Sequence, residues 1–118
     1  MDIRREKFYQ QINSAIDSIA NYLKENHEND LVYLKEPSES FEGVSCLKVA
    51  TYTGDKVISI KPKHYYVYDG KVGSISFINS SQHLVESTLY ENESGFEWKD
   101  CSIVDFLNQL LNEFGLRL

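Results

Sequence analysis

Residues 43–80 read GVSCLKVATYTGDKVISIKPKHYYVYDGKVGSISFINS, and their pattern decides the fold. Valine, isoleucine, threonine and tyrosine are dense here, and these side chains fit the half-buried surface of a β-sheet. Two turn signals, Gly54-Asp55 and Asp69-Gly70, interrupt the apolar runs. Asp-Gly between such runs is typical of a tight hairpin, since a type I′ turn needs positive φ at both central residues. The stretch therefore predicts consecutive antiparallel strands joined by hairpins.

The two turns also predict which side of the sheet each residue faces. A two-residue loop at Gly54-Asp55 places Lys48 opposite Lys61, and alternate residues then share a face. The same rule at the second turn divides the following strands in the same way. The predicted core face holds Leu47, Val49, Ile58, Ile60, His64, Tyr66, Ile75 and Phe77. The predicted outer face holds Lys48, Tyr52, Lys61, Lys63, Tyr65, Val67, Val72, Ser74 and Ser76.

Pro62 leaves an alternative open in this register. Proline cannot donate a ladder hydrogen bond, and it is found mostly at sheet edges or at bulges. A bulge at Pro62 would exchange the faces of the residues between it and Asp69.

Amphipathic helices are predicted on both sides of this stretch in the chain. The first carries one apolar stripe, at spacings of four, four, three and four residues, made of Phe8, Ile12, Ile16, Ile19 and Leu23. Asp2 is its candidate N-cap, and the polar run 25–30 ends it. The second helix carries Ile103, Phe106, Leu107, Leu110, Leu111 and Phe114. Ser102 followed by Asp105 resembles a capping box before it, and Gly115 suits its C-terminal cap.

Shorter segments complete the predicted fold. Residues 31–35 and 96–98 are predicted as short strands, and residues 83–90 as a further strand, with a short helix over 81–89 as the alternative. Two amphipathic helices that bracket an antiparallel meander predict a two-layer α+β sandwich, with both helices packed on one face of four to six strands. We expect a single domain over residues 1–118.

Acidic residues outnumber basic ones in this chain. Eighteen Asp and Glu against twelve Lys and Arg leave a net charge of −6. This balance argues against binding to duplex nucleic acid, which relies on basic side chains that neutralise phosphates. No apolar run reaches the roughly 18 residues of a membrane span, and the N-terminus lacks the apolar core of a signal peptide. We therefore expect a cytoplasmic protein without membrane contact.

Few residues suggest catalysis or metal binding. Cys46 and Cys101 are the only cysteines, without a CxxC or Cys/His cluster, so we expect free thiols and no metal or cofactor. The common hydrolase and nucleotide-binding motifs do not occur. A Cys101 nucleophile with His64 or His83 as base is disfavoured, because the neighbouring Asp100 disfavours a thiolate. We expect no enzyme and no catalytic residues.

Acidic residues concentrate in two segments, 25–42 and 86–105. Such runs ordinarily solvate a surface, but they also steer and bind basic partners. Trp98 lies in the second segment; tryptophan is a favoured interface anchor, and core packing is its alternative role. The candidate partner-binding residues are Glu36, Glu39, Glu42, Glu91, Glu93, Glu97 and Trp98.

The predicted outer sheet face carries the opposite charge. Residues 48–71 contain five Lys and two Asp, a balance of +3, so the remainder of the chain carries −9. Lysine stems that cover sheet surface are the ordinary role of such residues. The functional role is a site for an anionic ligand such as a nucleotide, or for single-stranded nucleic acid stacked on tyrosine. The candidate ligand-binding residues are Lys48, Tyr52, Lys61, Lys63 and Tyr65.

These features favour a non-enzymatic protein-binding protein. An acidic, tyrosine-rich domain suits an immunity-type antidote that masks the nucleic-acid groove of a basic toxin or nuclease. An acidic chaperone acting as a homodimer is a second hypothesis, and the anionic-ligand site on the outer face is a third. The inhibitor hypothesis predicts salt-sensitive binding that weakens when the loop acids are neutralised.

Overall fold

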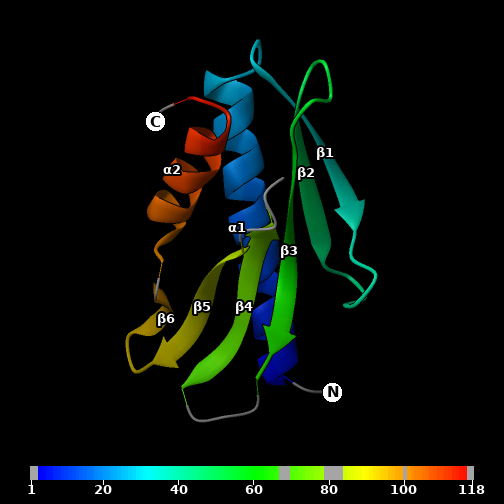
Figure 1. The fold of residues 1–118 in the computed structure, drawn as a ribbon. Helices are drawn as coiled ribbons and strands as arrows, with labels where there is room; N and C mark the ends of the chain where they lie inside the picture. The colour runs from blue at the N-terminus through cyan, green and yellow to red at the C-terminus, as the bar shows by residue number, and fades with distance from the viewer. Residues whose placement is uncertain (1–2, 67–69, 79–83, 100, 117–118) are drawn as a thin grey trace.

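Six strands follow one another across a single antiparallel sheet in chain order, with one helix before them and one after (Figure 1). This computed structural model describes residues 3–66, 70–78, 84–99 and 101–116. The elements are α1 (Ile3–Asn26), β1 (Leu31–Pro37), β2 (Ser45–Thr51), β3 (Val57–Tyr65), β4 (Lys71–Ile78), β5 (Leu84–Asn92), β6 (Gly95–Lys99) and α2 (Ile103–Glu113). The predicted α+β fold, an antiparallel meander between two terminal helices, is confirmed.

Both helices lie on the same side of the sheet (Figure 1). α1 packs across β2, β3 and β4 and buries its predicted apolar stripe there. α2 packs beside β5, and the ring of Phe106 meets that of Phe77 on β4 at 4.8 Å between centroids. The residues buried on this face as predicted are Leu47, Val49, Ile58, Ile60, Ile75 and Phe77. The periodicity of the central strands therefore predicts the core face correctly up to Pro62.

The loop between β2 and β3 is longer than predicted. Lys48 lies opposite Ser59 rather than Lys61. The loop closes where the N–H of Thr51 donates to the carbonyl of Lys56 at 3.2 Å, so it holds four residues instead of two. The register is shifted by two positions, an even number, and the predicted faces survive. The predicted opposition of Lys48 and Lys61 is wrong.

β3 contains a bulge directly after Pro62. The register against β4 shifts between Pro62 and His64, so Lys63 is the extra residue. His64 therefore lies on the outer face and is exposed, although the two-hairpin register places it on the core face. Tyr65 changes sides as well, and its ring packs against Phe8 of α1 at 5.6 Å between centroids. The alternative that Pro62 left open is the correct one.

Two further residues near the connection between β3 and β4 differ from the prediction. Tyr66, predicted on the core face, lies beside the outward-facing His64, with 5.5 Å between ring centroids. Val72, predicted on the outer face, is fully buried at a second register shift, between Lys71 and Gly73. Both differences follow from bulges, which change the side that each later residue faces.

Residues 84–92 form strand β5, so the strand alternative for this segment is correct and the helix alternative is wrong. Ser74 and Ser76 of β4 lie on the outer face as predicted, yet they are fully buried between their neighbours. Several predictions fall outside the described residues, namely those on Asp2, Val67, Asp69, His83 and Asp100.

α2 begins and ends as predicted. The hydroxyl of Ser102 accepts a hydrogen bond from the backbone N–H of Asp105 at 3.1 Å. Gly115 has a φ of +73°, and its N–H donates to the carbonyl of Asn112 at 3.0 Å. Glycine suits this position because a side chain would strain the left-handed backbone.

Candidate binding surface

The sheet face opposite the helices exposes apolar side chains near β1. Val32, Ala50 and Val57 lie in one cross-strand row on β1, β2 and β3. Val32 and Val57 are 44% and 45% exposed, and Leu34 beside them is 57% exposed. These four residues are called the outer apolar patch. A contiguous exposed apolar group is typical of an interaction surface, whereas single exposed apolar residues are not.

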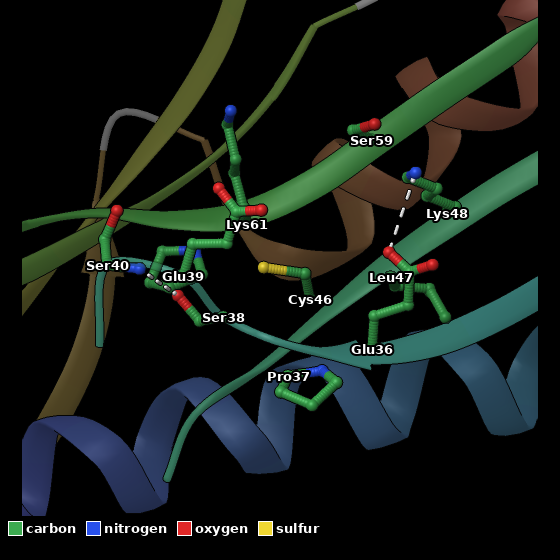
Figure 2. Close-up of a pocket in the computed structure, with 11 residues that line it drawn as sticks. Glu36, Pro37, Ser38, Glu39, Ser40, Cys46, Leu47, Lys48, Ser59 and Lys61 are labelled. Carbon is green, nitrogen blue, oxygen red and sulfur yellow. Dashed lines mark hydrogen bonds and ion pairs between the residues drawn. The ribbon is translucent and has the colours of Figure 1, made fainter. Parts of the chain in front are cut away.

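A cleft of about 210 Å³ lies next to the outer apolar patch, where the β1–β2 loop meets the outer face (Figure 2). Its polar lining consists of Glu36, Ser38, Glu39, Ser40, Cys46, Lys48, Ser59 and Lys61. Nζ of Lys48 lies 3.6 Å from Oε2 of Glu36, along a dashed line in Figure 2. The hydroxyl of Ser38 accepts from the N–H of Ser40 at 3.2 Å, which holds the loop in place. Two glutamates and two lysines thus balance one another around the cleft.

The thiol of Cys46 points toward Glu39 in this cleft (Figure 2). Burial raises the pKa of the Cys46 thiol above its ordinary value of 9.0, and this outweighs the lowering effects of Ser38 and Lys61. A thiol with a raised pKa is protonated at neutral pH and is a poor nucleophile. No disulfide joins it to Cys101. The described residues hold no group of three or more His, Cys, Asp and Glu placed for a metal ion.

The three candidate lysines of the outer face do not converge on one point. Lys48 is paired with a glutamate, as above, and Nζ of Lys63 lies 3.4 Å from Oε2 of Glu86. Lys61 is exposed, and in Figure 2 its ammonium extends away from the cleft. The ion pairs satisfy two of the three lysines within the chain, and they leave little positive charge for an anionic ligand.

The two candidate tyrosines of the outer face lie apart from these lysines. Tyr52 sits in the β2–β3 loop, and its hydroxyl donates to the carbonyl of Glu28 at 2.5 Å. Tyr65 faces the helix layer because of the bulge, and Arg5 of α1 lies 5.1 Å from its ring centroid. The structure therefore does not assemble the predicted combination of lysines and tyrosines into one site.

The acidic candidates lie at one end of the sheet but at its two opposite edges, because consecutive strands alternate in direction. The β1–β2 acidic corner comprises Glu36, Glu39 and Glu42. The β5–β6 acidic corner comprises Glu91, Glu93 and Glu97. Five interstrand steps of about 4.8 Å place the two edge strands roughly 24 Å apart. A partner would have to span the sheet to contact both corners.

Some of these carboxylates are paired and others are not. Glu36 lies beside Lys48, and Oε1 of Glu91 lies 3.3 Å from Nζ of Lys7 on α1. The remaining four are exposed and form no ion pair with the described residues: Glu39, Glu42, Glu93 and Glu97. These four are called the unpaired carboxylates.

Trp98 faces the helix layer. It lies opposite Leu89, which is fully buried, and it is itself partly buried against the core. Core packing, the alternative role predicted for Trp98, is therefore what this side chain does. It does not lie on the outer face beside the carboxylates.

The edge position of β1 is a structural feature that the sequence did not reveal. β1 pairs with β2 on one side and has no neighbour on its other side among the described strands. Two open hollows, of about 240 and 330 Å³, include residues 31–33 and 35–37 of this strand. A strand over 31–35 was predicted, but no residue in it encodes the order of strands in the sheet.

Comparison of the chain with family models, with curated proteins and with solved structures gives no match. Within the described part of the chain, no helix has both the length and the apolar character needed to cross a membrane.

Proposed function

We propose that this chain is a non-enzymatic, cytoplasmic protein-binding protein that docks onto a basic protein through acidic side chains. The class that fits best is an inhibitor or immunity-type antidote that masks a basic toxin or nuclease. Its carboxylates would occupy positions that nucleic-acid phosphates take on such a partner.

One observation carries this proposal: four exposed carboxylates lack a cation within the described chain. They are Glu39, Glu42, Glu93 and Glu97. Two other surface acids are neutralised internally: Asp17 by Lys35 at 2.5 Å, and Glu86 by Lys63 at 3.4 Å. Unpaired carboxylates are available to the lysines and arginines of a partner, and they attract it over about 10 Å at moderate salt.

The outer apolar patch supports a protein as the class of partner. It adjoins the β1–β2 acidic corner, because Leu34 of the patch is two residues from Glu36 on β1. Protein interfaces combine a desolvated apolar centre with a polar rim, and this combination is present along β1.

The proposal is tested by capture from a lysate of the host at low and at high salt, with identification by mass spectrometry. The baits are the wild type, two double variants and a control: Glu39→Gln/Glu42→Gln, Glu93→Gln/Glu97→Gln and Glu6→Gln/Glu25→Gln. The control pair removes the same charge from exposed positions of α1. We expect a basic protein that the wild type and the control retain, and that high salt and at least one test pair release. A partner retained equally by every bait at both salt concentrations would contradict the proposal.

A further inference from the structure

Strand β1 has backbone groups that no described strand uses. The N–H of Ser38 donates to the carbonyl of Val44 at 2.7 Å, which continues the β1–β2 ladder. Hydrogen-bonding positions alternate along an antiparallel pair, so the odd-numbered residues of β1 direct their backbone groups away from β2. The N–H and C=O groups of Tyr33 and Lys35 therefore point outward. Pro37 belongs to the same outward series, where its missing N–H costs no ladder bond.

Side chains on both faces of β1 suit an additional strand. On the outer face Val32 and Leu34 are exposed, so a neighbouring strand would bury apolar surface there. On the helix side Tyr33 packs against the core, and Nζ of Lys35 lies 2.5 Å from Asp17 of α1. A lysine on an edge strand ordinarily discourages pairing, but this ion pair neutralises its charge.

Carboxylates lie at both ends of this edge. Glu28 precedes β1, and Glu39 and Glu42 follow it; all three are exposed and form no ion pair with the described residues. Lys24 lines the hollow beside Glu28, which still leaves an excess of negative charge. The edge is therefore complementary to an extended segment with basic residues at its ends.

We propose that the free edge of β1 receives an extended segment of the basic partner as a seventh strand. The inference rests on the proposed function, because the carboxylates at its ends select a basic occupant. Apolar side chains of the segment would cover Val32 and Leu34, and its lysines or arginines would meet Glu28 and Glu39. Strand addition satisfies backbone groups of both chains, while alternate side chains supply specificity. A second copy of this chain fits less well, since each copy carries a net charge of −6.

The probe is the acetylated, amidated peptide Lys-Val-Thr-Val-Thr-Val-Lys, with a version carrying Glu at both ends as its charge control. Peptide binding is followed by isothermal titration calorimetry and by amide hydrogen exchange of the full chain. We expect the basic peptide to slow exchange at Tyr33 and Lys35 about ten-fold or more, because their N–H groups become hydrogen-bonded. The residues that already pair with β2 should change little.

A matched pair of variants separates the backbone from the side chain. Lys35→Pro removes the outward N–H at this position, whereas Lys35→Ala removes the same side chain and ion pair but keeps the N–H. We expect Lys35→Pro to weaken peptide binding about ten-fold or more, and Lys35→Ala to leave it within about two-fold. Thermal unfolding of both variants establishes whether each is folded. The hydrogen-exchange test uses only the wild-type chain, so it remains decisive if a variant does not fold.

The possible outcomes distinguish strand addition at β1 from the acidic docking function. Binding of the basic peptide without protection at Tyr33 and Lys35, or with equal effects of the two variants, would overturn the strand addition and leave the acidic docking function intact. Absence of binding would also overturn the strand addition, and the docking function would fall only if the lysate capture also failed. Protection of these amides that grows with protein concentration, without peptide, would make a second copy the occupant and overturn the inference.

Discussion

The ring of Phe8 lies against the backbone of Gly73, so closely that a methyl group on Gly73 would come within 2.0 Å of ring atom Cε1. The contact joins the first turns of α1 to the start of β4. Tyr65, which follows the β3 bulge, lies opposite Gly73 and packs against the same ring.

Gly73→Ala is expected to destabilise the protein by about 3 kcal/mol. The added methyl group would lie 2.7 Å from the carbonyl oxygen of His64, so it cannot move away from the Phe8 ring without a second clash. The measurement is urea unfolding. The same substitution in a Phe8→Leu background should cost clearly less, since the smaller side chain makes room. Equal costs in both backgrounds would mean that Phe8 is not the obstacle.

Two buried serines on neighbouring strands are expected to respond in opposite ways to alanine. The hydroxyl of Ser76 has no hydrogen-bond partner among the described residues, so Ser76→Ala should be neutral or stabilise the fold by up to about 1 kcal/mol. The hydroxyl of Ser87 donates to the carbonyls of Cys101 and Lys99, so Ser87→Ala should cost about 1–2 kcal/mol. Unfolding midpoints measured side by side check the sign. Destabilisation by both substitutions would show that Ser76 does have a partner.

Cys46 is expected to make stability fall at alkaline pH. Burial raises the pKa of its thiol in the folded state, so the thiol ionises first in the unfolded chain. Its contribution to stability is fully present below the ordinary value of 9.0 and is lost as pH rises above it. Urea midpoints at about pH 8 and about pH 10 measure the loss. Cys46→Ser, which does not titrate there, should lose less stability over this interval, and equal losses would refute the assignment.

The sheet could be predicted in good part from the sequence, and the errors have local causes. The faces of residues 47–50 and 57–60 are correct because the β2–β3 loop shifts the register by an even number of residues. After Pro62, the face that each residue is predicted to occupy depends on whether a bulge forms. The bulge places Tyr65 against Phe8, a contact between segments distant in the chain. Hairpin signals contain no information of this kind.

The candidate surface could be predicted less well. The exposure of the loop acids follows from composition, but their division between two edges depends on the order of six strands. The side that Trp98 faces depends on the β5–β6 register, which places it opposite the buried Leu89. The sequence predicts Lys63 in a ligand site, yet at its bulged position the ammonium group forms an ion pair with Glu86. Each of these outcomes requires tertiary pairing that a single segment does not specify.

The most direct test of the central claim is the affinity of the captured basic protein, measured at low and at high salt. For Glu39→Gln/Glu42→Gln we predict affinity about five-fold or more below the wild type at low salt, and a shallower decline as salt rises. The control Glu6→Gln/Glu25→Gln should bind as the wild type does. Equal affinities and equal salt dependence for the wild type and for both pairs of substitutions would contradict acidic docking at the β1–β2 corner.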